Sequence, residues 1–103
     1  MNRIKWSIKA ETDLAMIFSF LAEQSEKYAL ETIIAIDEKT QQLIDFPLSG
    51  QAQIFSRKKN KEYRYLVSGH YKIFYRLNGK TIYIVAVFDT RQHPKKLSLR
   101  LFK

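Results

Sequence analysis

Residues 71–89 read YKIFYRLNGKTIYIVAVFD, and this stretch decides the fold. Its two halves, over residues 71–77 and 80–88, are rich in the aromatic and β-branched residues that are typical of β-strands. Between them lies Asn78-Gly79, a pair that favours a two-residue hairpin turn of type I′ because both positions tolerate positive φ. The second half is apolar at nearly every position, which indicates a central strand covered on both faces. The stretch therefore predicts an antiparallel hairpin within a sheet.

Two amphipathic helices are predicted in the N-terminal half. A short strand over residues 2–7 ends at Ser7, whose hydroxyl suits the N-terminus of a helix. Apolar residues then recur every three or four positions until Glu23-Gln24. Ser25 is the predicted cap of a second helix, which ends before Pro47 because a residue preceding proline disfavours helical geometry. Helices joined by so few residues should form an antiparallel hairpin.

The remaining strands lie between Gly50 and the β-hairpin. Residues 52–58 and 63–67 show the pattern of strands, with a charged bend at Lys59-Asn60-Lys61 between them. No linker or repeat interrupts the chain, so one domain spanning residues 1–103 is expected. The predicted fold class is α+β in the order β-α-α-β-β-β, with the helical hairpin packed on one face of a twisted, mostly antiparallel sheet.

The composition excludes several classes of protein. The chain is 46% hydrophobic and contains no cysteine, which excludes a disordered chain, a disulfide framework and a thiolate metal site. No apolar run approaches the roughly 20 residues that span a bilayer, and no signal peptide opens the sequence. We therefore expect a cytoplasmic protein that contacts no membrane and uses no metal or cofactor.

Charge is divided unevenly between the two halves of the chain. Residues 1–50 hold five basic and eight acidic side chains, whereas residues 51–103 hold thirteen basic ones and only Glu62 and Asp89 as acids. A cationic field of this kind attracts polyanions or acidic protein segments. The C-terminal half is therefore expected to meet an anionic partner.

Several short motifs follow one another in a definite order. Trp6-Ser7 precedes Ala10-xx-Asp13-Leu14-xx-Ile17, and Phe46-Pro47-xx-Gly50 follows the second predicted helix. Tyr63-Arg64-xx-Val67 and Tyr71-Lys72-Ile73-Phe74-Tyr75-Arg76 lie in predicted strands, and Asp89-Thr90-Arg91-Gln92-His93-Pro94 ends the last one. In this order they resemble the RelE/ParE superfamily of toxins over about residues 4–97, and the ending resembles that of ParE-like members. The resemblance implies the toxin of a type II toxin–antitoxin module, which a small antitoxin neutralises.

The two branches of that superfamily differ in chemistry. RelE-type toxins cleave mRNA on the ribosome with basic residues and a tyrosine near the C-terminus, whereas known ParE toxins act on DNA gyrase without cutting anything themselves. Arg91 matches the RelE-type arginine just after the last strand. The arginine expected shortly before the strand at Tyr71 falls on Val67, however, and the C-terminal tyrosine falls on Leu97. The resemblance therefore implies a ParE-like toxin that inhibits DNA gyrase and is not itself a hydrolase.

Two alternatives stay open from the sequence. One is a RelE-type, ribosome-dependent mRNA endoribonuclease that needs no metal and uses a rearranged site of Arg64, Arg91, Lys58 and His93. The other is a non-toxic interaction module of the same fold.

Basic residues are the candidates for binding the target. Arg91 comes first, because the end of a long apolar strand should hold it while leaving it exposed. Arg64 and Arg76 either meet across the sheet as a cationic patch or pair with carboxylates such as Asp13 or Glu62. The strand tyrosines suit base stacking or, as we expect, core packing beneath the helices. The full set of target-binding candidates is Arg91, Arg64, Arg76, Lys58, Lys59, Lys61 and His93.

An alternating run near the C-terminus is the candidate antitoxin-binding segment. Leu97, Leu99 and Leu101 would otherwise leave apolar surface exposed. We expect the antitoxin to wrap the toxin with an acidic or amphipathic segment, docking against the helical hairpin and a sheet edge as well.

Overall fold

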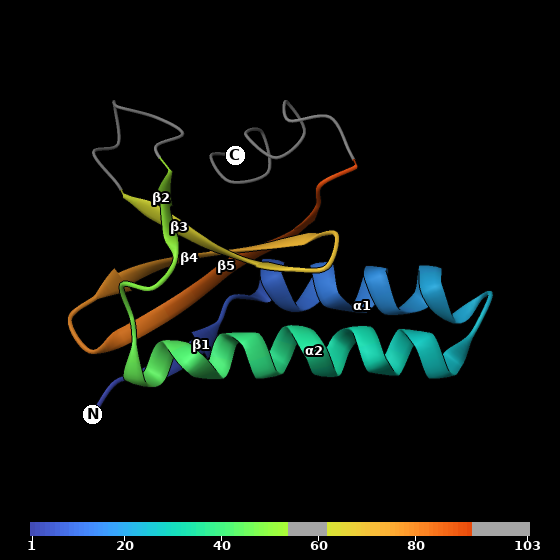
Figure 1. The fold of residues 1–103 in the computed structure, drawn as a ribbon, viewed down its shortest axis with the longest axis horizontal. Helices are drawn as coiled ribbons and strands as arrows, with labels where there is room; N and C mark the ends of the chain where they lie inside the picture. Colours follow the sequence, from blue (N-terminus) through green and yellow to red (C-terminus); the bar gives the residue numbers. More distant parts are fainter. Residues whose placement is uncertain (54–61, 92–103) are drawn as a thin grey trace.

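The computed structural model describes residues 1–53 and 62–91, which form two helices and five strands (Figure 1). Strand β1 (Arg3–Trp6) leads into helices α1 (Ile8–Ala22) and α2 (Glu26–Asp45). Strands β2 (Gln51–Gln53), β3 (Tyr63–Ser68), β4 (Tyr71–Asn78) and β5 (Thr81–Asp89) follow. The predicted α+β class and element order are confirmed. Of the strand predicted over residues 52–58, the part after Gln53 lies outside the described residues.

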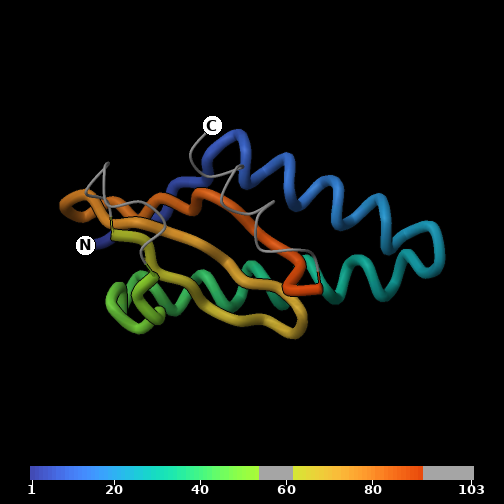
Figure 2. The backbone as a smooth tube through the Cα atoms, turned by 90° about the horizontal axis from the view of Figure 1, so that it is seen from above, coloured from blue at the N-terminus to red at the C-terminus, as the bar shows by residue number. Residues whose placement is uncertain are grey.

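The strands form one mixed sheet in the order β1-β5-β4-β3-β2. β1 runs parallel to β5 and the other neighbouring pairs are antiparallel, so the sheet is mostly antiparallel, as predicted. α1 packs against β5, and α2 packs against β3 and β1, so the helical hairpin covers one face of the sheet (Figure 2). In the described part of the chain, neither helix has the length and apolar character needed to cross a membrane.

Both helices begin at the predicted serines. Ser7 and Ser25 have extended backbones, and their hydroxyl oxygens accept hydrogen bonds from the N–H groups of Ala10 at 3.0 Å and Tyr28 at 3.1 Å. Each bond satisfies an N–H group that the first helical turn leaves without a partner. α2 ends at Asp45, just ahead of Pro47, as the restriction on the residue before proline predicts.

The core lies mainly between the helices and the sheet. A second buried cluster contains no helical residue and lies on the opposite face, because Phe74 alternates with its neighbours Ile73 and Tyr75 along β4. A register shift between β4 and β5 at Phe74/Tyr75 lets β5 supply buried residues to both faces, as predicted for a central strand. The main core contains Ala10, Ile36, Leu43, Leu66, Tyr71, Ile73, Tyr75, Ile82, Ile84 and Val87, and the second cluster contains Phe74, Ala86 and Phe88.

The hairpin between β4 and β5 turns one residue later than predicted. The two strands pair as far as Asn78, so the turn residues are Gly79-Lys80 and the expected Asn78-Gly79 turn is wrong. The observed register places Leu77 opposite Ile82, whereas the expected turn would have placed Leu77 opposite Lys80. Pairing of two apolar side chains explains the difference. Gly79 has a φ of +59°, in the left-handed region that favours glycine.

Replacing Gly79 by valine is expected to lower the free energy of unfolding by about 1 kcal/mol or more, because a β-branched residue is strained at positive φ. No atom lies within 4 Å of the position that the new Cβ would take, so the loss comes from backbone strain without a clash. The melting temperature should fall by about 4–8 °C per kcal/mol in a chain of this size. Gly79→Asn is the control and should lose less, since asparagine tolerates this region. Equal melting temperatures for the valine variant and the wild type would contradict the placement of the turn.

Candidate functional site

Arg91 follows β5 and is held by the carboxylate of Asp89. Its Nε and Nη2 atoms donate hydrogen bonds to Oδ1 and Oδ2 of Asp89 at 2.9 and 2.8 Å, and its backbone N–H donates to Oδ1 at 2.9 Å. The hydrogen bonds from Arg91 lower the pKa of the Asp89 carboxyl below its usual value, so the pair stays charged at neutral pH. The Arg91 side chain is nevertheless 56% exposed. A rigid strand thus presents a fixed guanidinium to solvent, as predicted.

The end of β5 is tied to the turn between β3 and β4. The backbone N–H and the hydroxyl of Thr90 both donate to the carbonyl oxygen of His70, each at 2.8 Å. Ser68 pairs with Tyr71, so His70 belongs to a tight two-residue turn. This tie fixes the backbone that carries Arg91.

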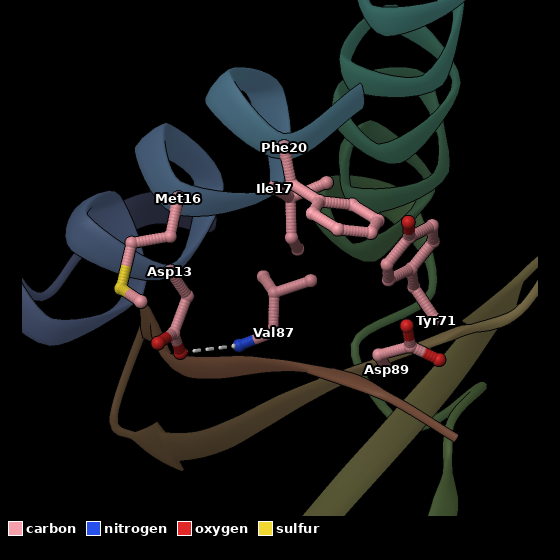
Figure 3. A pocket seen from close by; sticks show the side chains of 7 residues that line it. All are labelled: Asp13, Met16, Ile17, Phe20, Tyr71, Val87 and Asp89. Carbon is pink, nitrogen blue, oxygen red and sulfur yellow. Dashed lines mark hydrogen bonds between the residues drawn. The ribbon is translucent and has the colours of Figure 1, made fainter. Parts of the chain in front are cut away.

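A pocket of about 260 Å³ lies beside the ion pair, between α1 and the C-terminal half of β5 (Figure 3). Its walls are mostly apolar, and Ile17 and Phe20 point from α1 toward Val87 and Tyr71. Burial, together with the nearby Asp89 carboxylate, raises the pKa of the Tyr71 phenol, so the phenol stays neutral. Asp89 lines this pocket and also accepts the hydrogen bonds of the Arg91 guanidinium. The lining residues are Asp13, Met16, Ile17, Phe20, Tyr71, Val87 and Asp89.

Asp13 is a buried carboxylate that completes the edge of the sheet. It is 3% exposed and accepts a hydrogen bond at 2.9 Å from the backbone N–H of Val87. β1 reaches only as far as Trp6, which pairs with Ile84, so β1 offers no carbonyl to that N–H group. The Asp13 carboxylate on α1 supplies the hydrogen-bond acceptor that a neighbouring strand would otherwise provide. The sequence does not reveal this contact, because the two residues lie far apart along the chain.

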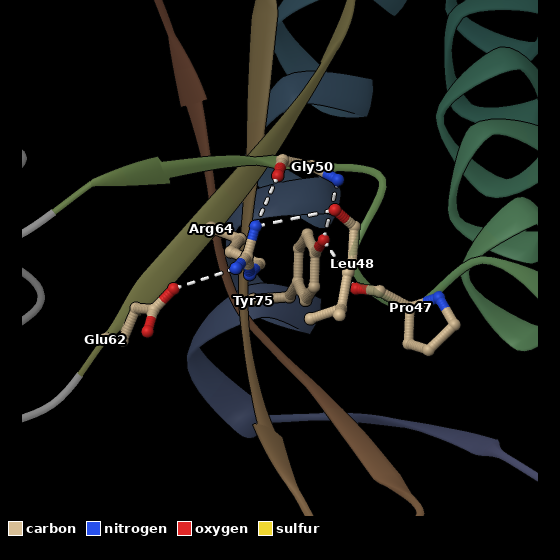
Figure 4. A network of polar contacts seen from close by, with 6 residues as sticks. All are labelled: Pro47, Leu48, Gly50, Glu62, Arg64 and Tyr75. Carbon is tan, nitrogen blue, oxygen red and sulfur yellow. Dashed lines mark hydrogen bonds and ion pairs between the residues drawn. The ribbon is translucent and has the colours of Figure 1, made fainter.

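Tyr75 holds the loop between α2 and β2 from inside the core (Figure 4). Its hydroxyl donates to the carbonyl oxygen of Pro47 at 2.8 Å and accepts from the N–H of Gly50 at 2.9 Å. Burial raises the pKa of the Tyr75 phenol, so it stays protonated and keeps its role as a donor. The loop therefore has a fixed path across the end of the sheet.

Arg64 binds the same loop from β3. Its Nη1 atom donates to the carbonyl oxygen of Gly50 at 2.9 Å and more weakly to that of Leu48 at 3.4 Å, and its Nη2 atom pairs with Glu62 at 2.9 Å. Pairing with Glu62 was one of the two predicted alternatives and is confirmed. These contacts give Arg64 a structural role. Any role in binding the target stays a prediction.

The other alternative, in which Arg64 and Arg76 meet across the sheet as a cationic patch, is wrong. Arg64 stands opposite Tyr75 across β3 and β4, on the face that the helices cover. Arg76 is the next residue after Tyr75, and neighbouring residues of a strand point to opposite faces. The two guanidinium groups therefore lie on different sides of the sheet.

The face without helices carries cations stacked on tyrosine rings. The guanidinium carbon of Arg76 lies 4.8 Å from the ring centroid of Tyr83, and Nζ of Lys72 lies 4.4 Å from that of Tyr65. Tyr71 and Tyr75, by contrast, belong to the core beneath the helices. Core packing is thus confirmed for these two tyrosines, whereas Tyr65 lies on the other face.

The remaining candidates lie outside the described residues. Among the described target-binding candidates, Arg91 is more exposed than Arg64, whose side chain is 23% exposed. The candidates outside the described residues are Lys58, Lys59, Lys61 and His93 for the target, and Leu97, Leu99 and Leu101 for the antitoxin. Their roles stay predictions.

The sequence analysis missed the α1 side of the pocket. Met16 and Phe20 lie one helical turn apart and are 66% and 64% exposed. Both stand outside the core-facing stripe of α1. A pair of large apolar residues spaced i, i+4 away from that stripe was the available signal, because such a pair forms a second apolar surface.

Comparison with known proteins agrees with this geometry. The sequence matches the family described as "ParE toxin of type II toxin-antitoxin system, parDE" over residues 4–94, a range that includes the pocket and Arg91. A solved structure entitled "Chromosomal ParDE TA system from P. aeruginosa" is similar, with a TM-score of 0.71 and 25% sequence identity over 86% of this chain and 96% of that chain. No curated protein matches the sequence. The chain therefore belongs to the ParE toxin family of type II toxin–antitoxin systems.

Proposed function

We propose that this toxin inhibits DNA gyrase and is neutralised by a small antitoxin that carries an acidic segment. The family match over residues 4–94 carries the proposal, because its description names a type II toxin–antitoxin system. Gyrase as the target follows from the resemblance to ParE-like toxins. The uneven charge supports it. Thirteen basic side chains against two acidic ones in residues 51–103 favour an anionic partner surface.

Arg91 is the residue through which we expect the toxin to meet its target. Its guanidinium offers a planar set of donors suited to carboxylates and phosphates. Because Asp89 already fixes the side chain, little conformational entropy is lost when a partner binds. Met16 and Phe20 are exposed apolar residues that line the same pocket as Asp89, and they add the contact area that protein interfaces use.

Two observations disfavour the endoribonuclease alternative. The positions expected to hold a basic residue and a tyrosine are Val67 and Leu97, neither of which can stabilise developing charge or transfer a proton. Arg64, part of the rearranged site considered above, is engaged by Glu62 and by the loop that it holds.

The antitoxin is proposed to dock against the helical hairpin and a sheet edge. The segment with Leu97, Leu99 and Leu101 contributes to this contact in the proposal. Deleting residues 97–103 should weaken antitoxin binding, and the melting temperature of the truncated toxin shows whether the fold survives the deletion.

Side-by-side assays of purified DNA gyrase and of a translating ribosome test the proposed function. Wild-type toxin should inhibit supercoiling and leave ribosome-bound mRNA intact. Arg91→Ala should raise the toxin concentration for half-inhibition by about tenfold or more, with an unchanged melting temperature. Arg3→Ala is the matched control, because Arg3 is an exposed arginine on β1 beside Thr81, at the other end of β5. Its half-inhibition should stay within about twofold of the wild type.

Other outcomes have distinct meanings. Cleavage of mRNA at ribosome-positioned codons, without inhibition of gyrase, would replace this proposal by the endoribonuclease. Full activity of Arg91→Ala would move the target contact elsewhere, first to the charged bend over Arg57–Lys61. A toxin inactive in both assays would leave only the interaction module.

A further inference from the structure

The two layers of the domain carry opposite charge. All eight acidic side chains of residues 1–50 lie in α1, in α2 or in the turn between them. Among the strand residues that the structure describes, only Asp89 is acidic, and it lines the pocket beside α1. The helix-free face, defined as the face of the sheet that α1 and α2 do not cover, carries Lys5, Lys72 and Arg76. The described strands thus present cations and no carboxylate on this face.

Alternation along the strands places these three cations. Each of them stands between two residues that belong to the main core or pack against it, so each points to the opposite face. Tyr83 of β5 pairs with Lys5 on one side and with Arg76 on the other. Neighbouring strands are about 4.8 Å apart, so the backbones of Lys5 and Arg76 are about 10 Å apart, and Lys72 lies about 13 Å from Arg76 along β4. The cations are therefore spread over the face and not gathered at one point.

Two of the cations are held by tyrosine rings. The guanidinium of Arg76 lies against the ring of Tyr83, and the ammonium of Lys72 lies against that of Tyr65. A side chain held in this way loses less conformational entropy when it binds a partner. The ring face that the cation occupies is not free for a base to stack on. The helix-free face therefore offers positioned charges for phosphate groups and not rings for bases.

Exposed apolar side chains are concentrated elsewhere. Of the large apolar residues that are exposed in the described part of the chain, only Val67 lies in a strand. Phe74 and Phe88, on the helix-free face, are 0% and 3% exposed. A protein partner draws most of its binding energy from exposed aromatic and apolar anchors, whereas a nucleic-acid backbone needs only suitably placed cations. The helix-free face therefore fits a nucleic acid better than an acidic protein segment.

We infer that the helix-free face binds the phosphate backbone of double-stranded DNA without reading its bases. The choice of DNA rests on the proposed function, because DNA gyrase acts on duplex DNA. Lys5, Lys72 and Arg76 supply the phosphate contacts. Arg3 stands at the corner of this face, where it donates to the Thr81 hydroxyl at 3.4 Å, and it is not counted among them. The toxin thus meets the protein and the DNA of the same complex through separate surfaces.

Fluorescence anisotropy with purified toxin and a labelled 20-base-pair duplex, without gyrase, tests the site. Duplexes of unrelated sequence should bind equally well, and the logarithm of the affinity should fall with the logarithm of the salt concentration with a slope of about −2.7 or steeper, about 0.9 for each contact. Arg76→Glu should weaken binding by about fivefold or more and make the slope shallower by about 0.9. Lys72→Glu serves as a second variant if the melting temperature of Arg76→Glu falls.

Lys27→Glu is the matched control. It makes the same change in net charge at an exposed position of α2, so its affinity for DNA should stay within about twofold of the wild type. If folded Arg76→Glu and Lys72→Glu lose no more affinity than this control, the inference is overturned. Tighter binding of the wild type to single-stranded RNA or to an acidic peptide than to duplex DNA would also overturn it.

Inhibition of gyrase is measured separately from DNA binding. Arg76→Glu should raise the toxin concentration for half-inhibition of supercoiling by about fivefold or more. Unchanged inhibition by a variant that has lost DNA binding would overturn the use of this face against gyrase. DNA binding by a toxin that leaves gyrase active would reject the proposed function and support the site itself. Inhibition of gyrase by a toxin that does not bind DNA would overturn this inference alone.

Discussion

Gly50→Ala is expected to lower the free energy of unfolding by about 3–5 kcal/mol, through overpacking and lost hydrogen bonds. An added Cβ would lie 2.5 Å from the Tyr75 hydroxyl, 2.6 Å from its Cε1 atom and 2.9 Å from the carbonyl oxygen of Tyr65. Tyr75 is fully buried, so its ring has no room to move aside. The loop would have to shift instead, which breaks the bond from Gly50 N–H to the Tyr75 hydroxyl and the bond from Arg64 to the Gly50 carbonyl.

Urea unfolding of three variants checks this expectation. Ser49→Ala is the control in the same loop, and because Ser49 is exposed it should lose less than about 1 kcal/mol. Tyr75→Phe removes the atom closest to the new Cβ, so adding it to Gly50→Ala should cost less than the sum of the two single changes. A loss below about 1 kcal/mol in Gly50→Ala would show that the loop yields easily.

The elements of the fold could be predicted because their signals are local. Each signal acts on near neighbours in the chain. The signals are a serine three residues before the N–H group that it caps, a proline shortly after a helix, and a run of aromatic and β-branched residues. The turn at Gly79 was predicted one residue early, because the turn pair was weighed without the apolar pairing of Leu77 and Ile82. The close approach of Gly50 to Tyr75 spans 25 residues, so no local pattern indicates it either.

The candidate site was predictable only in part. Arg91 follows a long apolar strand, and that position alone indicated a fixed and exposed guanidinium. The pocket beside it brings together Phe20, Tyr71 and Val87 from three separate elements, and no local pattern relates them. The alternative in which Arg64 and Arg76 meet was based on strand proximity, which does not say which face of the sheet each side chain takes. The face that a side chain takes depends on the pairing register of its strand, and the whole sheet sets that register.

Asp13→Ala is expected to lower the free energy of unfolding by about 2–4 kcal/mol, because it leaves a buried N–H group without its acceptor and opens a cavity. Val87 is 2% exposed, so water does not readily replace the carboxylate there. The matched control is Asp37→Ala, an exposed carboxylate on the other helix, which should change stability by about 0.5 kcal/mol at most.

Asp13→Asn separates the hydrogen bond from the charge. The amide oxygen of asparagine still accepts from Val87, so this variant should keep most of the stability that alanine loses. Hydrogen exchange at the Val87 amide gives the local readout: protection should persist in Asp13→Asn and fall strongly in Asp13→Ala, beyond the change in global stability. Equal losses in the two variants would mean that the negative charge, and not the acceptor, stabilises this edge. Because β5 continues from Val87 to Asp89, a frayed edge in Asp13→Ala should also loosen the guanidinium of Arg91 and the pocket beside it.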